Sequence, residues 1–93
     1  MLRVNVKAFG LLKEVIRDTY FEIDRGNSLE DLLLQMVENY GEDFTKQIFD
    51  PKKKMIQKGV GISVNGQFIN GDVSATKLKD SDRVAFFILV SGG

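Results

Sequence analysis

The sequence contains no cysteine and no histidine. Without cysteine there is no disulfide, no thiolate nucleophile and no thiolate metal ligand. Without histidine the chain lacks the commonest general base near neutral pH and the commonest zinc ligand. Carboxylates alone could bind a hard cation, but the spacing of Asp72, Asp80 and Asp82 does not match a calcium loop with its closing Glu. We therefore expect no metal site, no bound cofactor and no independent enzymatic activity.

The chain also lacks an excess of either charge, because 13 Lys and Arg balance 13 Asp and Glu. A protein that tracks phosphates needs a basic face, so we expect no nucleic-acid partner. No stretch approaches the roughly 20 apolar residues that span a bilayer, so we expect no membrane partner and a cytoplasmic location. The 93 residues, 43% of them hydrophobic, suit one small domain over residues 1–93 with a single core.

The first half of the chain changes its hydrophobic period three times. Residues 2–8 alternate apolar and polar side chains, which predicts a strand with one buried face. Residues 9–17 carry apolar side chains at helical spacing and predict a short helical connection. Residues 19–24 alternate again and predict a second strand, antiparallel to the first.

A longer helix is predicted next, over residues 29–40. Ser28 precedes it and Asp31 follows three residues later, which resembles a capping box. Gly41 stands where the helix should end. The apolar stripe is wide enough to cover a core and consists of Leu29, Leu32, Leu33, Met36, Val37 and Tyr40. A weaker helical piece over residues 42–49 should be broken at Pro51, and the lysines at 52–54 should form a solvated loop.

The remaining strands are separated by turn signals. Residues 60–64 predict a third strand, and Asn65-Gly66 is a strong hairpin signal that leads to a short fourth strand at 68–69. We expect Leu78 to fill the core from a loop. An acidic turn at 80–82 should then precede the last strand.

The last strand is apolar on both faces, because residues 84–90 read VAFFILV. Such a strand belongs in the middle of a sheet. Its natural neighbour is the first strand, in parallel, because the helix over 29–40 supplies the crossover that parallel pairing requires. We therefore expect an α+β fold whose mixed sheet has its first and last strands parallel at the centre and one main helix on one face.

The other face of that sheet has no predicted helix to cover it. By alternation, three side chains of the last strand should point inward and three outward. The inward set is Val84, Phe86 and Ile88, and the outward set is Ala85, Phe87 and Leu89. An exposed Phe and Leu in this position predict a docking patch for a partner.

The order of two strands, a helix and three strands is the β-grasp pattern, and with the terminal Gly92-Gly93 it resembles the ubiquitin-like sulfur carriers. The closest resemblance is to the small subunit of molybdopterin synthase, of the MoaD type, with ThiS-like carriers related to it. The resemblance rests on VNVKAFGLLKE at 4–14, SVNGQFI at 63–69 and DSDRVAFFILVSGG at 80–93. Three features depart from the family. Ile88-Leu89 replaces two prolines that are frequent there, Ser81 replaces a frequent glycine, and residues 42–59 are longer than in compact members.

The resemblance implies a function for the C-terminal residues. An E1-like adenylating enzyme would use ATP to join AMP to the carboxylate of Gly93, and sulfur would then displace AMP to leave a thiocarboxylate. Gly92 would let a flexible tail of residues 91–93 enter a narrow site, because glycine has no side chain to obstruct it. The molybdopterin synthase large subunit would supply the substrate pocket and the catalytic lysines, and a cyclic pyranopterin precursor would receive the sulfur. Phe87, Leu89, Ser91 and Lys13 are the expected partner-binding residues.

Three other functions remain open from the sequence. A ubiquitin-like modifier would join the same activated Gly93 to lysines of target proteins. A thiazole-pathway carrier would use the same thiocarboxylate, although such carriers usually lack so long a middle segment. A non-catalytic β-grasp binding module would carry an inert tail.

Overall fold

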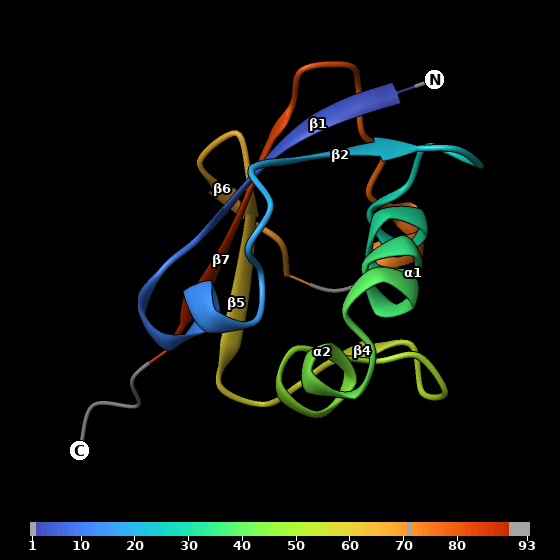
Figure 1. Cartoon of the computed structure of the whole chain (residues 1–93). Helices are drawn as coiled ribbons and strands as arrows, with labels where there is room; N and C mark the ends of the chain where they lie inside the picture. Colours follow the sequence, from blue (N-terminus) through green and yellow to red (C-terminus); the bar gives the residue numbers. More distant parts are fainter. Residues whose placement is uncertain (1, 71, 90–93) are drawn as a thin grey trace.

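The fold is built on a five-stranded sheet in the order β2-β1-β7-β5-β6. The computed structural model describes residues 2–70 and 72–89. β1 and β2 are antiparallel, whereas β1 and β7 are parallel, so the first and last strands are adjacent at the centre as predicted (Figure 1). The strands of this sheet are β1 (Leu2–Ala8), β2 (Tyr20–Ile23), β5 (Val60–Val64), β6 (Gln67–Phe68) and β7 (Arg83–Ile88).

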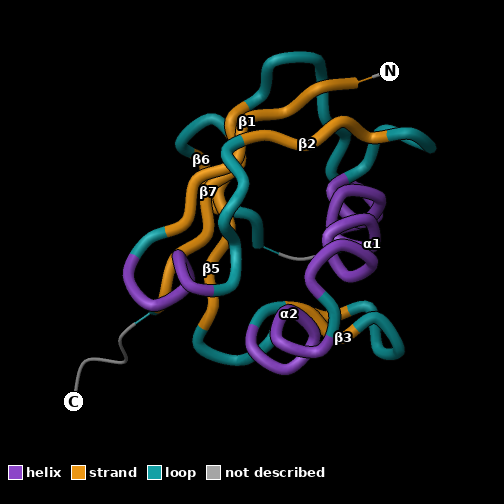
Figure 2. Tube along the Cα trace, viewed as in Figure 1, coloured by secondary structure: helices purple, strands orange, loops and turns teal. Residues whose placement is uncertain are grey.

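Helix α1 (Leu29–Tyr40) covers one face of the sheet and leaves the other face open (Figure 2). The predicted apolar stripe supplies its buried side chains, and Leu29, Leu32, Leu33 and Met36 are completely inaccessible to solvent. Leu78 reaches the same core from a loop, as expected. The arrangement confirms the α+β, β-grasp prediction.

Helix α1 begins at a complete capping box. The Asp31 backbone N–H donates to Ser28 Oγ over 3.1 Å, and the Ser28 backbone N–H donates to Asp31 Oδ2 over 3.0 Å. The hydrogen bond from the Ser28 backbone is the largest influence on this carboxyl and lowers the pKa of Asp31 from its usual value, against a smaller opposing effect of burial. The cap therefore satisfies two backbone donors that a helix start otherwise leaves free.

The connection between β1 and β2 contains η1 (Gly10–Glu14), a short 3₁₀ helix that matches the predicted helical connection. The buried Leu12, Val15 and Ile16 anchor it beneath the sheet edge. None of the helices within residues 2–70 and 72–89 combines the length and apolar character needed to cross a membrane.

The segment after α1 differs from the prediction. Its helical part, α2 (Glu42–Gln47), ends two residues earlier than expected, and Phe49 instead begins a two-stranded ribbon of β3 (Phe49–Asp50) and β4 (Met55–Ile56). Asp50 Oδ1 accepts hydrogen bonds from two backbone N–H groups of the lysine turn, which fixes that turn. The apolar side chains of this segment belong to the core: Phe44, Ile48 and Phe49 are fully buried.

Two tight turns hold the edges of β5 and β7 together. Asn65 and Gly66 both have positive φ, 51° and 87°, which fits the predicted two-residue hairpin turn between β5 and β6. Ser81 also has a positive φ of 72°, at the position where the resembling family often has glycine. A short 3₁₀ turn, η2 (Val73–Ala75), precedes this region and contributes the buried Val73.

Candidate functional site

The candidate site is the open face of β7 together with the point where this strand ends. β7 lies between β1 and β5 and bonds to both. On the covered face, Val84 and Phe86 are buried as predicted, and the ring of Phe86 meets the ring of Phe44 at 6.4 Å in an edge-on contact. Phe44 belongs to α2, so the middle segment completes the core under β7.

Ile88 does not follow the predicted pattern of burial. It was expected to face the core with Phe86, but its side chain is 45% exposed. Ile88 is the last residue of β7 and lies at the end of the sheet, near Gly10 of η1, where a Cβ atom would come within 3.9 Å of Ile88 Cδ1. Alternation places Ile88 on the same face as Phe86, as predicted, but the core does not extend far enough along the strand to bury it.

The open face carries an aromatic stack centred on Phe87. The rings of Phe87 and Phe9 are nearly parallel, with centroids 4.7 Å apart and planes inclined by 6°. Phe68 contacts the other side of Phe87, with centroids 5.4 Å apart. Phe87 is thus half-buried by two aromatic neighbours that are themselves 36% and 61% exposed. The outward orientation predicted for Phe87 is confirmed.

Leu89 continues this apolar surface beyond the strand. Its side chain is 50% exposed and lies against Gly61 of β5. We call the set of Phe9, Phe68, Phe87 and Leu89 the aromatic patch. Contiguous exposed apolar side chains of this kind usually mark an interaction site.

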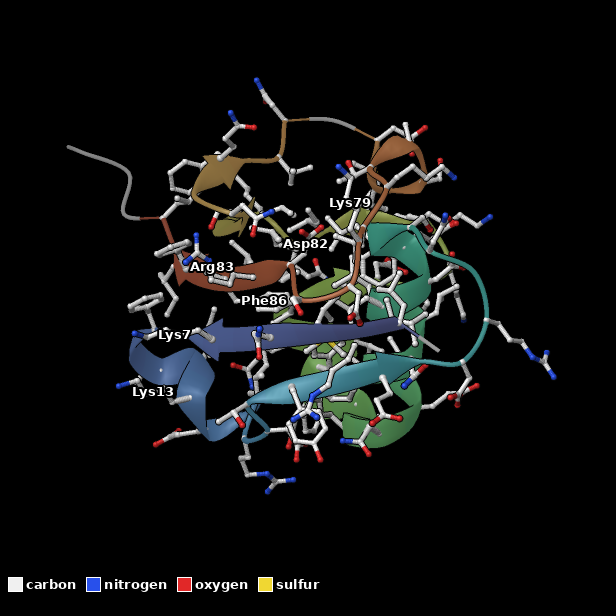
Figure 3. The ribbon with its side chains drawn as sticks, turned by 90° about the horizontal axis from the view of Figure 1, so that it is seen from above. Lys7, Lys13, Lys79, Asp82, Arg83 and Phe86 are labelled. Atoms are coloured by element: carbon white, nitrogen blue, oxygen red, sulfur yellow. The ribbon has the colours of Figure 1, made fainter. Side chains whose placement is uncertain are left out.

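Basic side chains share the open face with the aromatic patch. Strand register places Arg3, Lys7 and Arg83 on the open face, and the Lys7 Nζ lies 5.2 Å from the centre of the Phe9 ring. Lys13 is exposed on η1, and in Figure 3 it lies at the same end of the sheet as Lys7. Within the described part of the chain, Lys13 has no carboxylate within ion-pair distance. A partner for this surface would have an apolar hollow with acidic groups at its edge.

The acidic turn before β7 is used inside the molecule. Asp80 Oδ1 accepts from the Arg3 backbone N–H at 2.9 Å, and Asp82 accepts from Asn65 Nδ2 and from the Lys79 backbone N–H. Residues 2–70 and 72–89 contain no cluster of three ligand-type side chains suited to a metal ion. These carboxylates fix the start of β7.

Ser91, Gly92 and Gly93, the residues expected to be activated or to reach the partner, lie outside the described residues. Their roles remain predictions. Of the predicted site residues, the structure brings Phe87 and Leu89 to one surface and places Lys13 on η1 at the same end of the sheet.

Sequence reasoning missed Phe9 and Phe68 as members of the patch. The signal for Phe68 was present, because a two-residue Asn65-Gly66 turn sets Phe68 opposite Ser63, on the face that Ile62 does not occupy. A signal for Phe9 was present as well, because Phe9 continues the alternation of β1 on the face of Lys7, and the parallel pairing of Lys7 with Ala85 sets it beside Phe87.

Comparisons with known proteins agree with this fold. The ThiS family model matches residues 6–93. No curated protein matches the chain significantly. Small archaeal modifier protein 1 from Methanosarcina acetivorans is 28% identical with a TM-score of 0.73, and the match covers 100% of this chain and 98% of that one.

Two further solved structures share the fold. The putative molybdopterin converting factor, subunit 1, from Pyrococcus furiosus has a TM-score of 0.72 and 24% identity, over 97% of this chain and 100% of that one. A chain of the BexX/CysO complex from Amycolatopsis orientalis has a TM-score of 0.70 and 15% identity, over 97% of this chain and 99% of that one.

Proposed function

The chain belongs to the ThiS family of ubiquitin-like sulfur carriers, and we propose that it is the sulfur-carrying small subunit of a molybdopterin synthase. One observation carries the proposal: the central strand β7 leads directly to residues 90–93, and the aromatic patch lies on the open face beside the end of that strand. A partner that binds the patch would hold the glycines close to its own reactive site. The similarity to a putative molybdopterin converting factor subunit supports the same reading.

The chemistry takes place at the carboxylate of Gly93. An E1-like adenylating enzyme joins this carboxylate to the α-phosphate of ATP and releases pyrophosphate. The mixed anhydride then has AMP as a leaving group, so sulfide-level sulfur from a donor can attack the carbonyl carbon. AMP departs with the electron pair of the broken C–O bond, and a thiocarboxylate remains on Gly93.

The chain itself contributes binding and presentation. Phe87 and Leu89 are the apolar anchors for the adenylating enzyme and for the large subunit. Lys13 contacts an acidic group at the edge of the partner's binding surface. Gly92 and Ser91 allow the chain end to pass through a narrow opening, because neither adds a bulky side chain. The large subunit supplies the pocket in which the sulfur is transferred to a cyclic pyranopterin precursor.

A second candidate function is protein modification. It is favoured by the 28% identity to a small archaeal modifier protein over the whole chain. In that role the acyl group of Gly93 is transferred to a lysine amine, which forms an isopeptide bond and releases AMP or a thiol. Activation is the same in both roles, and only the final acceptor differs.

Intact-mass spectrometry distinguishes these functions. The chain is incubated with its adenylating enzyme, ATP and a sulfur donor. For the carrier we expect a mass increase equal to the exchange of one oxygen for sulfur, located on Gly93, which the large subunit then removes. Conjugates to lysine without any thiocarboxylate would replace this proposal by the modifier function. Complete absence of AMP transfer would contradict both and leave a binding module.

A further inference from the structure

The end of β7 is held to β5 by a backbone hydrogen bond and by the packing of one side chain. The Leu89 backbone N–H donates to the Gly59 carbonyl at 2.7 Å, which extends the pairing with β5 by one residue beyond Ile88. The Leu89 side chain then folds back over Gly61. A Cβ atom added to Gly61 would lie 3.0 Å from Leu89 Cδ2 and 3.2 Å from Leu89 Cγ.

This contact explains why residue 61 is a glycine. Gly61 lies within a regular strand and has no positive φ, so its backbone conformation does not require glycine. Space favours glycine, because a Cβ atom at 3.0–3.3 Å from three Leu89 side-chain carbons would be tighter than nine in ten real Cβ contacts, so the Leu89 side chain would have to give way by a few tenths of an ångström. Glycine inside a strand commonly marks such a close approach. Gly61 itself is buried, although Leu89 above it is half exposed.

We propose that Leu89, Gly61 and Gly59, which we call the Leu89 clamp, fix the point at which the reactive end of the chain leaves the sheet. Leu89 and Gly61 are then positioning residues for the activation of Gly93, and this inference rests on the proposed function. The four residues that follow Leu89 can span at most about 13–14 Å, at 3.3–3.6 Å per residue. With so short a reach, the starting point limits the positions that the reacting carboxylate can occupy.

The clamp depends on features that the patch does not need. Leu89 can donate its hydrogen bond only because it has a backbone N–H, which a proline in this position would lack. Its side chain can lie flat against β5 only because Gly61 has no side chain. Adding one methyl group at residue 61 therefore disturbs the clamp while it leaves all four side chains of the aromatic patch chemically intact.

The test compares Gly61→Ala, Leu89→Ala and the double variant, with Ser63→Ala as a control on the same strand and the same face. The first measurement is amide hydrogen exchange by NMR in the free protein. We expect the Leu89 amide of Gly61→Ala to exchange about tenfold faster, as local opening of one strand end does, while the amides of Val84 and Phe86 are unchanged. In the double variant the smaller residue 89 removes the clash, so the protection of its amide should return.

The second measurement is the steady-state kinetics of adenylation. Gly61→Ala should lower kcat about tenfold, because small misplacements of a reacting group have large effects on rate, and should raise KM less than Leu89→Ala does, because all four side chains of the aromatic patch are still present. The double variant should recover kcat but show the raised KM of Leu89→Ala, which has lost a patch side chain. If Gly61 had a purely structural role, Gly61→Ala would not lower kcat by more than it raises KM.

Each result decides a separate point. Unchanged Leu89 exchange in Gly61→Ala would show that the clamp does not exist. Faster exchange with wild-type kcat would overturn the positioning role. Wild-type protein that accepts no AMP would refute the proposed function, and the positioning role with it, whereas the exchange data would still decide whether the Leu89 clamp forms.

Discussion

β7 contains two adjacent phenylalanines with different roles. Phe86 contributes to stability, and Phe87 contributes to partner binding. Phe86 is completely buried against α2, whereas Phe87 stacks on Phe9 in the open face. The two side chains are chemically identical, so the difference between them reflects only the face of the strand on which each lies. This alternation was predictable, because a period of two is the strongest regularity of a strand.

Truncating each of them to alanine should have opposite consequences. Phe86→Ala should lower the free energy of unfolding by about 3–5 kcal/mol, the range for emptying a buried Phe site. Phe87→Ala should lower it less than Phe86→Ala does, because the Phe87 ring is only partly buried and loses two aromatic pairs worth about 0.5–1.5 kcal/mol each beyond the buried area. At the centre of an interface, however, loss of an aromatic anchor commonly weakens binding by about 2 kcal/mol or more.

Urea unfolding measures the first effect, and calorimetric titration with the adenylating enzyme measures the second. The reversed pattern in the two variants would mean that the faces of β7 are assigned the wrong way round. Equal destabilisation with unchanged binding would remove the aromatic patch from the partner interface.

At the scale of the elements, sequence reasoning succeeded where one regular pattern ran over many residues. Helix α1 was predicted because its period and its capping signals agree, β1 because it alternates, and β7 because it is a continuous apolar run. The β3–β4 ribbon was missed, because each of its strands has two residues and no period can be read from two. The exposure of Ile88 was missed, because a period of two gives the face of a strand residue but not how far the core extends along the strand. Tertiary neighbours decide such positions.

Strand β2 shows how one element protects another. β2 is an edge strand, and Gln35 of α1 bonds to its outer side. The Asp24 backbone N–H donates to Gln35 Oε1 at 3.2 Å, and Gln35 Nε2 donates to the Glu22 carbonyl. One amide thus satisfies a donor and an acceptor, as a neighbouring strand would, and blunts an edge that could otherwise pair with another chain.

Gln35→Leu should therefore promote self-association through β2. We expect faster sedimentation in the ultracentrifuge than for wild-type protein at equal concentration, because the Glu22 carbonyl and the Asp24 N–H become free to pair. Glu38→Leu is the matched control. It adds the same apolar side chain one turn later on α1 without removing those hydrogen bonds. Equal sedimentation of both variants and the wild type would show that Gln35 has no such protective role.

At the scale of the whole molecule, the fold separates two tasks. The helices, the ribbon and one face of the sheet form the core, and the other face is left to carry the aromatic patch (Figures 1 and 2). The net charge is zero, yet Arg3, Lys7 and Arg83 share the open face. The β-grasp architecture followed from the order of the elements, but the stacking of Phe9 on Phe87 and the packing of Leu89 on Gly61 required the three-dimensional structure.

The central claim is that the patch binds the partner while Gly93 supplies the reacting carboxylate. The most direct measurement is ATP–pyrophosphate exchange by the adenylating enzyme, with wild-type protein and with a variant that lacks Gly93. We expect the variant to keep its thermal midpoint and its affinity for the enzyme, because the patch and the core are intact, but to support no exchange. If a variant without Gly93 still supported exchange, Gly93 would not be the residue that is activated.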